Sequence, residues 1–101
     1  MFRSIQDWYA AQCDGDWEHE FGVKIATLDN PGWSVSIDLA GTALENAEFT
    51  EISNLAPQVD WINCKVQGRK FEGRCGPGML EAVISSFLAW ANDVSGPGLR
   101  R

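Results

Sequence analysis

The sequence has few positive charges and an excess of negative ones. Only 8 of its 101 residues are lysine or arginine, against 14 aspartates and glutamates, so the formal net charge is -6. Nucleic acids and anionic membranes both require a positive protein surface, so this composition disfavours either of them as a partner. An acidic domain is instead suited to a basic protein partner, which it attracts electrostatically.

The sequence also lacks long hydrophobic segments. Its beginning, MFRSIQDWYAAQ, has no apolar signal-peptide region, and no later segment is as long and apolar as a membrane span. We therefore expect a cytoplasmic protein without a membrane partner.

Cysteine is scarce as well. Cys13, Cys64 and Cys75 are an odd number at wide spacings, which indicates free thiols and neither a disulfide framework nor a zinc knuckle.

The remaining composition predicts one folded domain over residues 1–101. This length leaves no room for a second core, and a hydrophobic content of 45% is typical of a packed globule. Residues 95–101, SGPGLRR, are expected to form a frayed tail.

Helices are predicted near both ends of the chain. Ser4 followed by Asp7 is a capping-box pattern, which predicts a helix over residues 4–13. Residues 76–92 carry apolar side chains at helical spacing, and Pro77 suits the first helical position.

Two strands are predicted after the first helix. Residues 16–28 alternate with period two, so an extended strand here would place its carboxylates on one face and its aromatic rings on the other. Residues 33–39, WSVSIDL, alternate in the same way. Between them, DNPGW predicts a turn with Gly32 at positive φ, and the resulting hairpin would pair Lys24 with Asp38.

Further strand candidates are residues 48–53, residues 59–67 and a short edge strand at KFEG, residues 70–73. The order of these elements predicts an α+β domain. We expect a four- to five-stranded antiparallel sheet with the N-terminal and the C-terminal helix packed on one face.

The segment CDGDWEHE, residues 13–20, concentrates four carboxylates around the chain's single histidine. As a calcium loop it fails, because His19 stands where glycine is needed and Ile25 where a bidentate glutamate belongs. A zinc site would need His19 together with Cys13 and a carboxylate, but the alternating pattern places His19 on the buried face. Carboxylates along one solvated face also have no reason to differ in pKa, as acid–base catalysis requires. The sequence therefore predicts no metal, no cofactor and no catalytic residue.

Cys64 gives rise to an alternative function. Cys64 and Arg69 have the C-x4-R spacing of the rhodanese active loop, so a small sulfurtransferase using Cys64 is the alternative function. The same cysteine sits within an alternating strand pattern, where a buried thiol acts as a small apolar side chain.

A binding surface is the remaining interpretation of the acidic segment. Like charges on one face of a strand repel one another, so local stability gives no reason for the cluster. It can be a docking site for a basic protein or only a solvated face. The basic residues Lys65, Arg69, Lys70 and Arg74 could also pair with it, within the fold or across a dimer, although nothing in the sequence supports a homo-oligomer.

Residues 8–39 contain three specific motifs: WYxxQC from Trp8 to Cys13, DGDWEHxxG from Asp14 to Gly22 and TLDNPGW from Thr27 to Trp33. With these motifs the segment resembles the immunity protein 53 family of bacterial polymorphic toxin systems. A weaker similarity continues through DWINCKV and KFEG to Trp90.

The resemblance implies neutralisation of a cognate toxin by binding inside the producing cell, without catalysis and without a cofactor. The acidic charge suits a toxin that is basic, such as a nuclease. Toxin contact is expected from Asp14, Asp16, Trp17, Glu18, Glu20 and Trp61. The alternative for this motif is a structural corner between helix and strand, with Trp17 and His19 packed beneath it.

Overall fold

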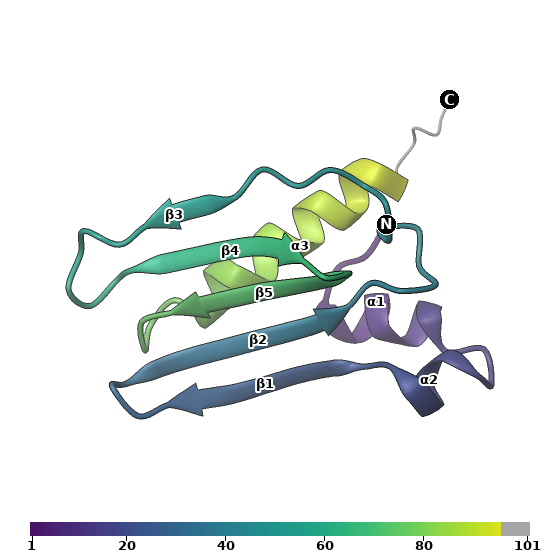
Figure 1. The fold of residues 1–101 in the computed structure, drawn as a ribbon, viewed down its shortest axis with the longest axis horizontal. Coiled ribbons are helices and arrows are strands. Elements are labelled where there is room, and N and C mark those ends of the chain that lie inside the picture. Colours follow the sequence, from purple (N-terminus) through teal and green to yellow (C-terminus); the bar gives the residue numbers. More distant parts are fainter. Residues whose placement is uncertain (96–101) are drawn as a thin grey trace.

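Figure 1 shows the computed structural model of the chain, which describes residues 1–95. One antiparallel sheet has the strand order β1-β2-β5-β4-β3, and the helices lie on one side of it. The elements are α1 (Ile5–Gln12), α2 (Trp17–Glu20), β1 (Val23–Leu28), β2 (Gly32–Asp38), β3 (Ile52–Asn54), β4 (Ile62–Gln67), β5 (Lys70–Cys75) and α3 (Leu80–Ser95). The predicted α+β class is confirmed. Apart from Ser95, which ends α3, the predicted frayed tail lies outside the described residues.

The predicted edge strand KFEG is in fact the central strand. β5 pairs with β2 on one side and with β4 on the other, so its prediction as an edge was wrong. Its alternate residues Phe71, Gly73 and Cys75 are all buried, while Glu72 and Arg74 point to the opposite face. One of the buried positions of β5 is a glycine and the alternate positions are charged, so the hydrophobic pattern of this strand is weak. Helix α3 nevertheless covers one face of it.

Helix α3 packs closely on β5 because Gly73 has no side chain. A Cβ at Gly73 would lie only 2.5 Å from Cγ1 of Val83, so the missing methyl group is the space that Val83 fills. Phe87 of the same helix packs edge-on against Phe71 at 5.1 Å and against Trp8 of α1 at 5.0 Å between ring centroids. The predicted apolar stripe is thus confirmed. The helix begins at Leu80, however, and not at Pro77.

The β1–β2 hairpin is confirmed, but two of its predicted details are wrong. Lys24 lies opposite Ser36 and not opposite Asp38. Gly32 is not among the glycines of the described chain with positive φ; instead, a Cβ there would collide with the backbone oxygen of Cys75 in β5. Glycine is therefore required at this position by the close approach of two strands.

The predicted strand over residues 16–28 is correct only from β1 onward. Trp17–Glu20 form the helical turn α2, so the carboxylates do not alternate along a strand face, and His19 is exposed. The sequence pattern does not separate a strand from a helical turn here, because Trp17 and Phe21, four residues apart, fit both periods. Their ring centroids lie 5.9 Å apart.

Side-chain hydrogen bonds fasten the loops and the N-terminus to this frame. The indole Nε1 groups of Trp33 and Trp90 donate to the carbonyl oxygens of Pro77 at 3.0 Å and Glu48 at 2.8 Å. The side chain of Asn92 in α3 both accepts from the backbone N–H of Phe2, at 2.7 Å, and donates to the Phe2 oxygen, at 2.9 Å. The first residues are thereby tied to the last helix. No helix within residues 1–95 is long and apolar enough to cross a membrane.

Replacing Gly32 by alanine should lower the free energy of unfolding by about 1–3 kcal/mol, because the new methyl group overlaps the Cys75 carbonyl and forces β2 and β5 apart. Urea unfolding of the variant measures this loss. Gly78→Ala is the matched control, since no atom lies within 4 Å of its Cβ position, and it should change stability by less than about 0.5 kcal/mol. Equal losses in both variants would contradict this account of the contact.

Candidate functional site

Residues 13–20 form a hydrogen-bonded turn followed by α2, which we call the acidic corner. Oδ1 of Asp14 accepts from the backbone N–H groups of Asp16, at 3.0 Å, and Trp17, at 2.9 Å. The two carboxylate oxygens of Glu18 accept from the N–H groups of Asp14, at 3.0 Å, and Gly15, at 2.9 Å. Gly15 adopts the positive φ of 97° that the turn requires. The two carboxylates therefore hold the turn and α2 together.

These hydrogen bonds stabilise the ionised carboxylates. The bond from the Trp17 amide, followed by that from Asp16, lowers the pKa of Asp14 below its ordinary value of 3.8. Hydrogen bonds from its own amide and from those of Asp14 and Gly15 lower the pKa of Glu18 below 4.5. Both groups are thus negatively charged at neutral pH, and their charge is part of the local structure.

The other members of the corner differ in what they contact. Trp17 is buried, with 7% of its surface exposed, and its Nε1 donates to the Ala40 oxygen at 2.8 Å. Asp16 precedes α2 but makes no capping hydrogen bond with its side chain. Asp16 and Glu20 are both exposed. Two of the four carboxylates are therefore held by backbone amides, and two remain accessible to a partner.

The side of the sheet away from the helices carries a second charged surface. Its side chains alternate with the buried residues of β2, β4 and β5, and we call it the open sheet face. It comprises Lys24, Ser34, Ser36, Asp38, Asn63, Lys65, Gln67, Lys70, Glu72 and Arg74. The sequence prediction missed this surface, because only the central position of β5 shows that Glu72 and Arg74 lie next to Lys65. The alternation of charged residues in KFEGR was the available signal.

The basic residues do not pair with the acidic corner. Arg69 instead contacts Glu45, with 3.2 Å between nitrogen and oxygen, and Lys70 contacts Asp38 at 3.5 Å. Asp38 also accepts a hydrogen bond from the backbone N–H of Gly22 at 2.9 Å, which fastens the start of β1 to β2. The alternative that this basic run neutralises the corner within the fold was therefore wrong.

Trp61, the last predicted contact residue, lies at the other end of the sheet. Its backbone oxygen accepts a hydrogen bond from Gly76 at 3.0 Å, beside the paired residues Ile62 and Cys75. The acidic corner leads instead into Val23, at the beginning of β1. The strands between these ends span roughly 17 Å at about 3.3 Å per residue. The structure therefore does not bring Trp61 and the corner together into one compact patch.

The indole ring of Trp61 nevertheless borders the open sheet face. Successive side chains of a strand point to opposite faces, and Gly32 stands three positions before the buried Val35. A side chain at Gly32 would therefore point away from the core. A Cβ at Gly32 would lie 3.4 Å from Cζ2 of Trp61, so the ring covers this glycine from the open side. The other four tryptophans belong to the core or pack against it. Trp61 and the acidic corner are thus opposite ends of one surface.

Comparison with known families gives a match to immunity protein 53 over residues 2–92. The chain belongs to the immunity protein 53 family. No curated protein and no solved structure matches the chain. The resemblance seen in the first motifs therefore extends over both the sheet and α3, and it supports an immunity function for this fold.

The thiols of this immunity protein do not favour the sulfurtransferase alternative. Cys64 has no exposed surface and lies on the core side of an antiparallel strand. Burial, with a smaller contribution from Cys75, raises the pKa of the Cys64 thiol to about 11, so a nucleophilic thiolate is disfavoured at neutral pH. Arg69 lies in the β4–β5 turn and pairs with Glu45, and no loop cradles the sulfur.

The acidic residues in the described part of the chain do not form a metal centre. Within residues 1–95, no group of three or more histidine, cysteine, aspartate or glutamate side chains is arranged to hold a metal ion. In the acidic corner itself, the oxygens of Asp14 and Glu18 are engaged by backbone amides. The corner as folded therefore resembles a capped turn more than a cation site.

Replacing Asp14 or Glu18 by alanine should lower the midpoint of urea unfolding at pH 7, because each substitution leaves two backbone amides without their acceptor. Both pKa values are lowered by folding, so this stabilisation is complete above the unfolded values of 3.8 and 4.5 and is lost as the pH falls through the folded values. The difference from the wild type should therefore shrink in acid.

The control for this pair is Asp16→Ala, which removes a carboxylate of the same corner that caps nothing and should change the midpoint little. Unfolding is followed by tryptophan fluorescence at pH 7 and at about pH 3, near the range in which the carboxylates protonate. A loss of equal size at both pH values would contradict a role for the ionised carboxylates.

Thiol reactivity provides a separate check. Cys13 is exposed, whereas Cys64 and Cys75 are buried, so Ellman's reagent should react quickly with one thiol of the folded protein and with all three in urea. Cys13→Ser should remove the fast reaction. A fast thiol remaining in this variant at pH 8 would have to be Cys64 or Cys75. It would contradict the inertness expected from their burial.

Proposed function

We propose that this protein neutralises a cognate bacterial toxin domain by binding it in the cytoplasm, and that the bound toxin surface is basic. Membership of the immunity protein 53 family supports a toxin as the partner. The net charge of -6 favours attraction to a basic protein over association with nucleic acid or an anionic membrane.

This proposal depends most on a difference between the four carboxylates of the acidic corner: two are hydrogen-bonded to the turn and two are exposed. Asp14 and Glu18 accept hydrogen bonds from the turn, so they fix its shape. Asp16 and Glu20 are exposed, and the same corner positions their carboxylates without using them. Four negative charges held close together on a rigid turn cost local stability through repulsion. Contact with lysine and arginine side chains of a toxin would offset that repulsion.

The predicted contact residues take different parts in this proposal. Asp16 and Glu20 contact the toxin, and Asp14, Trp17 and Glu18 position the corner. Burial of Trp17 makes it an anchor, because its ring packs against Trp8 at 6.0 Å between centroids and its N–H is bonded to Ala40. Trp61 supplies an aromatic contact at the far end of the open sheet face, as a partly exposed indole does in many interfaces.

The proposed activity is binding alone and includes no bond-making step. Inhibition of a toxin by occlusion needs shape and charge complementarity, which the corner and the open sheet face can offer without a nucleophile or a cofactor. Cys64 is unsuited to serve as a nucleophile for the reasons given above.

The first experiment is affinity capture of the tagged protein from an extract of its own organism, with washes at low and at raised salt and identification of bound polypeptides by mass spectrometry. Recovery of a basic toxin domain that is released as salt rises would support the proposal. Recovery of nothing but the protein itself would contradict it.

Charge reversal in the corner should then weaken binding of the captured toxin. Glu20→Lys and Asp16→Lys should each slow association roughly tenfold at low salt and reduce its salt dependence, since exposed charges act mainly on the rate of encounter. Surface plasmon resonance measures both quantities. The unfolding midpoint should not change, because neither carboxylate is hydrogen-bonded in the corner.

The matched control is Glu81→Lys, which makes the same change of charge at an exposed position in the first turn of α3. It should leave association almost unchanged. An equal effect of Glu81→Lys would mean that net charge alone governs binding, and a large drop in unfolding midpoint without loss of affinity for Glu20→Lys would make the corner purely structural.

A further inference from the structure

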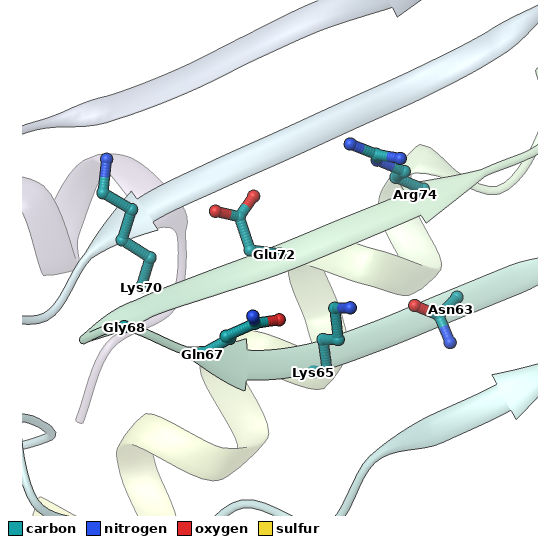
Figure 2. A pocket seen from close by; sticks show the side chains of 7 residues that line it. All are labelled: Asn63, Lys65, Gln67, Gly68, Lys70, Glu72 and Arg74. Atoms are coloured by element: carbon teal, nitrogen blue, oxygen red, sulfur yellow. The ribbon is translucent and has the colours of Figure 1, made fainter.

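Folding gathers much of the positive charge of an acidic protein onto one face. Four of the eight basic residues of the chain, Lys24, Lys65, Lys70 and Arg74, belong to the open sheet face. Its carboxylates are Asp38 and Glu72, together with Glu51, which accepts a hydrogen bond from Asn63 of this face at 3.0 Å. In Figure 2 the side chains of β4 and β5 project from this face, and the helices lie behind the sheet. Four cations against three carboxylates leave one positive charge in excess on a molecule that is acidic as a whole.

Three of these cations form no salt bridge. Lys70 is held by Asp38 at 3.5 Å, whereas Lys24, Lys65 and Arg74 form none with any residue in the described part of the chain, and all three are exposed. Glu72 lies directly across from Lys65 in the β4–β5 register, and Glu51 accepts a hydrogen bond from Asn63, the residue across from Arg74, so these carboxylates offset part of the positive charge. Exposed cations without a salt bridge attract an anionic group.

The surface is also hollowed. A depression of about 480 Å³ is lined by side chains of β4 and β5, among them Asn63, Lys65, Glu72 and Arg74 (Figure 2). A second depression of about 400 Å³ runs from Lys70 across β2 to the start of β1 and the acidic corner. Lys70 lines both, so the two depressions adjoin at its side chain, and we call them together the furrow.

The furrow has distinct ends. Glu20 of the acidic corner lines one of them, and Trp61 covers the edge of the sheet beyond Arg74 at the other. A polypeptide segment lying in it would contact a carboxylate, then a stretch in which cations alternate with Asp38 and Glu72, and then an indole ring. This order of charges gives the furrow a direction along which a partner can be recognised.

We propose that the furrow of the open sheet face binds an acidic segment of the toxin polypeptide, with Lys65 and Arg74 as its main contacts. The inference rests on the proposed immunity function and adds to it: the toxin presents basic residues to the acidic corner and acidic residues to the sheet. Charge complementarity on two adjoining surfaces of opposite sign fixes the orientation of a partner, which a single charged patch does not.

A polypeptide fits the furrow better than nucleic acid does. Glu72 lies within the depression and Asp38 borders it, and both would repel a row of phosphates. Sequence-independent nucleic-acid binding needs several phosphate contacts, and the net charge of -6 opposes them at long range. A segment in which carboxylates alternate with neutral residues can place its charges next to Lys65 and Arg74 alone.

The test uses a peptide of three Glu-Ser repeats as the probe and the full-length protein labelled with nitrogen-15. Amide chemical shifts recorded during the titration should change in residues 62–75 and not in α3, and a peptide of three Gln-Ser repeats should cause no change. The double variant Lys65→Gln/Arg74→Gln should bind the probe at least about tenfold more weakly, as expected for two lost charge-assisted contacts.

Arg3→Gln is the control, because Arg3 is exposed and precedes α1, on the helical side of the molecule. It should bind the Glu-Ser peptide as the wild type does. Equal loss in both variants, shift changes confined to other elements, or tighter binding of a hexathymidylate oligonucleotide than of the peptide would each overturn the inference, the last in favour of nucleic acid.

The same variants separate this inference from the proposed function. In the capture experiment, Lys65→Gln/Arg74→Gln should retain less of the toxin than Arg3→Gln does. If Glu20→Lys loses the toxin while the double variant retains it fully, the immunity function stands and the furrow is not part of the interface. If the double variant and the wild type both fail to retain a toxin yet differ in their binding of the Glu-Ser peptide, the proposed function falls and the acidic-peptide site remains.

Discussion

The contact between Gly73 of β5 and Val83 of α3 determines how the rest of the molecule is arranged. Without a side chain at Gly73, the helix approaches the central strand until Val83 occupies the space of the missing methyl group. That approach brings Phe87 against Phe71 and Trp8, which joins both terminal helices to the sheet. Since one helix pair covers a single face, the other face must be polar to remain in water, and its side chains become free for recognition.

The charges follow from this one-sided packing. Residues at every second position of β4 and β5 have to face solvent, and there the sequence places lysine, arginine and glutamate in place of apolar side chains. The acidic corner lies beside this surface because α2 leads directly into β1. A molecule that is acidic overall thus presents neighbouring surfaces of both signs, and long-range attraction and the geometry of the final contact can be set by different residues.

Sequence patterns predicted the parts of the fold that depend on local periodicity. The β1–β2 hairpin and the apolar stripe of α3 are repeated over enough residues to be unambiguous. The position of β5 was not predictable in this way, because Gly73 weakens a strand pattern unless one knows that Val83 fills the gap. The α2 turn was missed because Trp17 and Phe21 satisfy two periods. The helical turn is selected by hydrogen bonds that the carboxylates of Asp14 and Glu18 accept from backbone amides.

The sequence likewise predicted only part of the candidate site. The acidic residues and Trp61 were identified by their composition and by a family motif, whereas their roles depend on which carboxylates the backbone engages. Lys65 and Arg74 were noted only as part of a basic run. Their place beside Glu72 follows from strand pairing between segments whose register no local pattern specifies.

The order of the strands has a consequence for when the protein can act. β5 is the last strand of the chain but lies between β2 and β4, so the earlier strands have no common partner until it has been made. Asn92 then ties the first residues to the final helix. During synthesis, nearly the whole polypeptide has to emerge from the ribosome before the fold can form. Chains that end before β5 leave β1–β2 and β3–β4 as separate pairs, so the surface that would face a partner exists only in completed molecules.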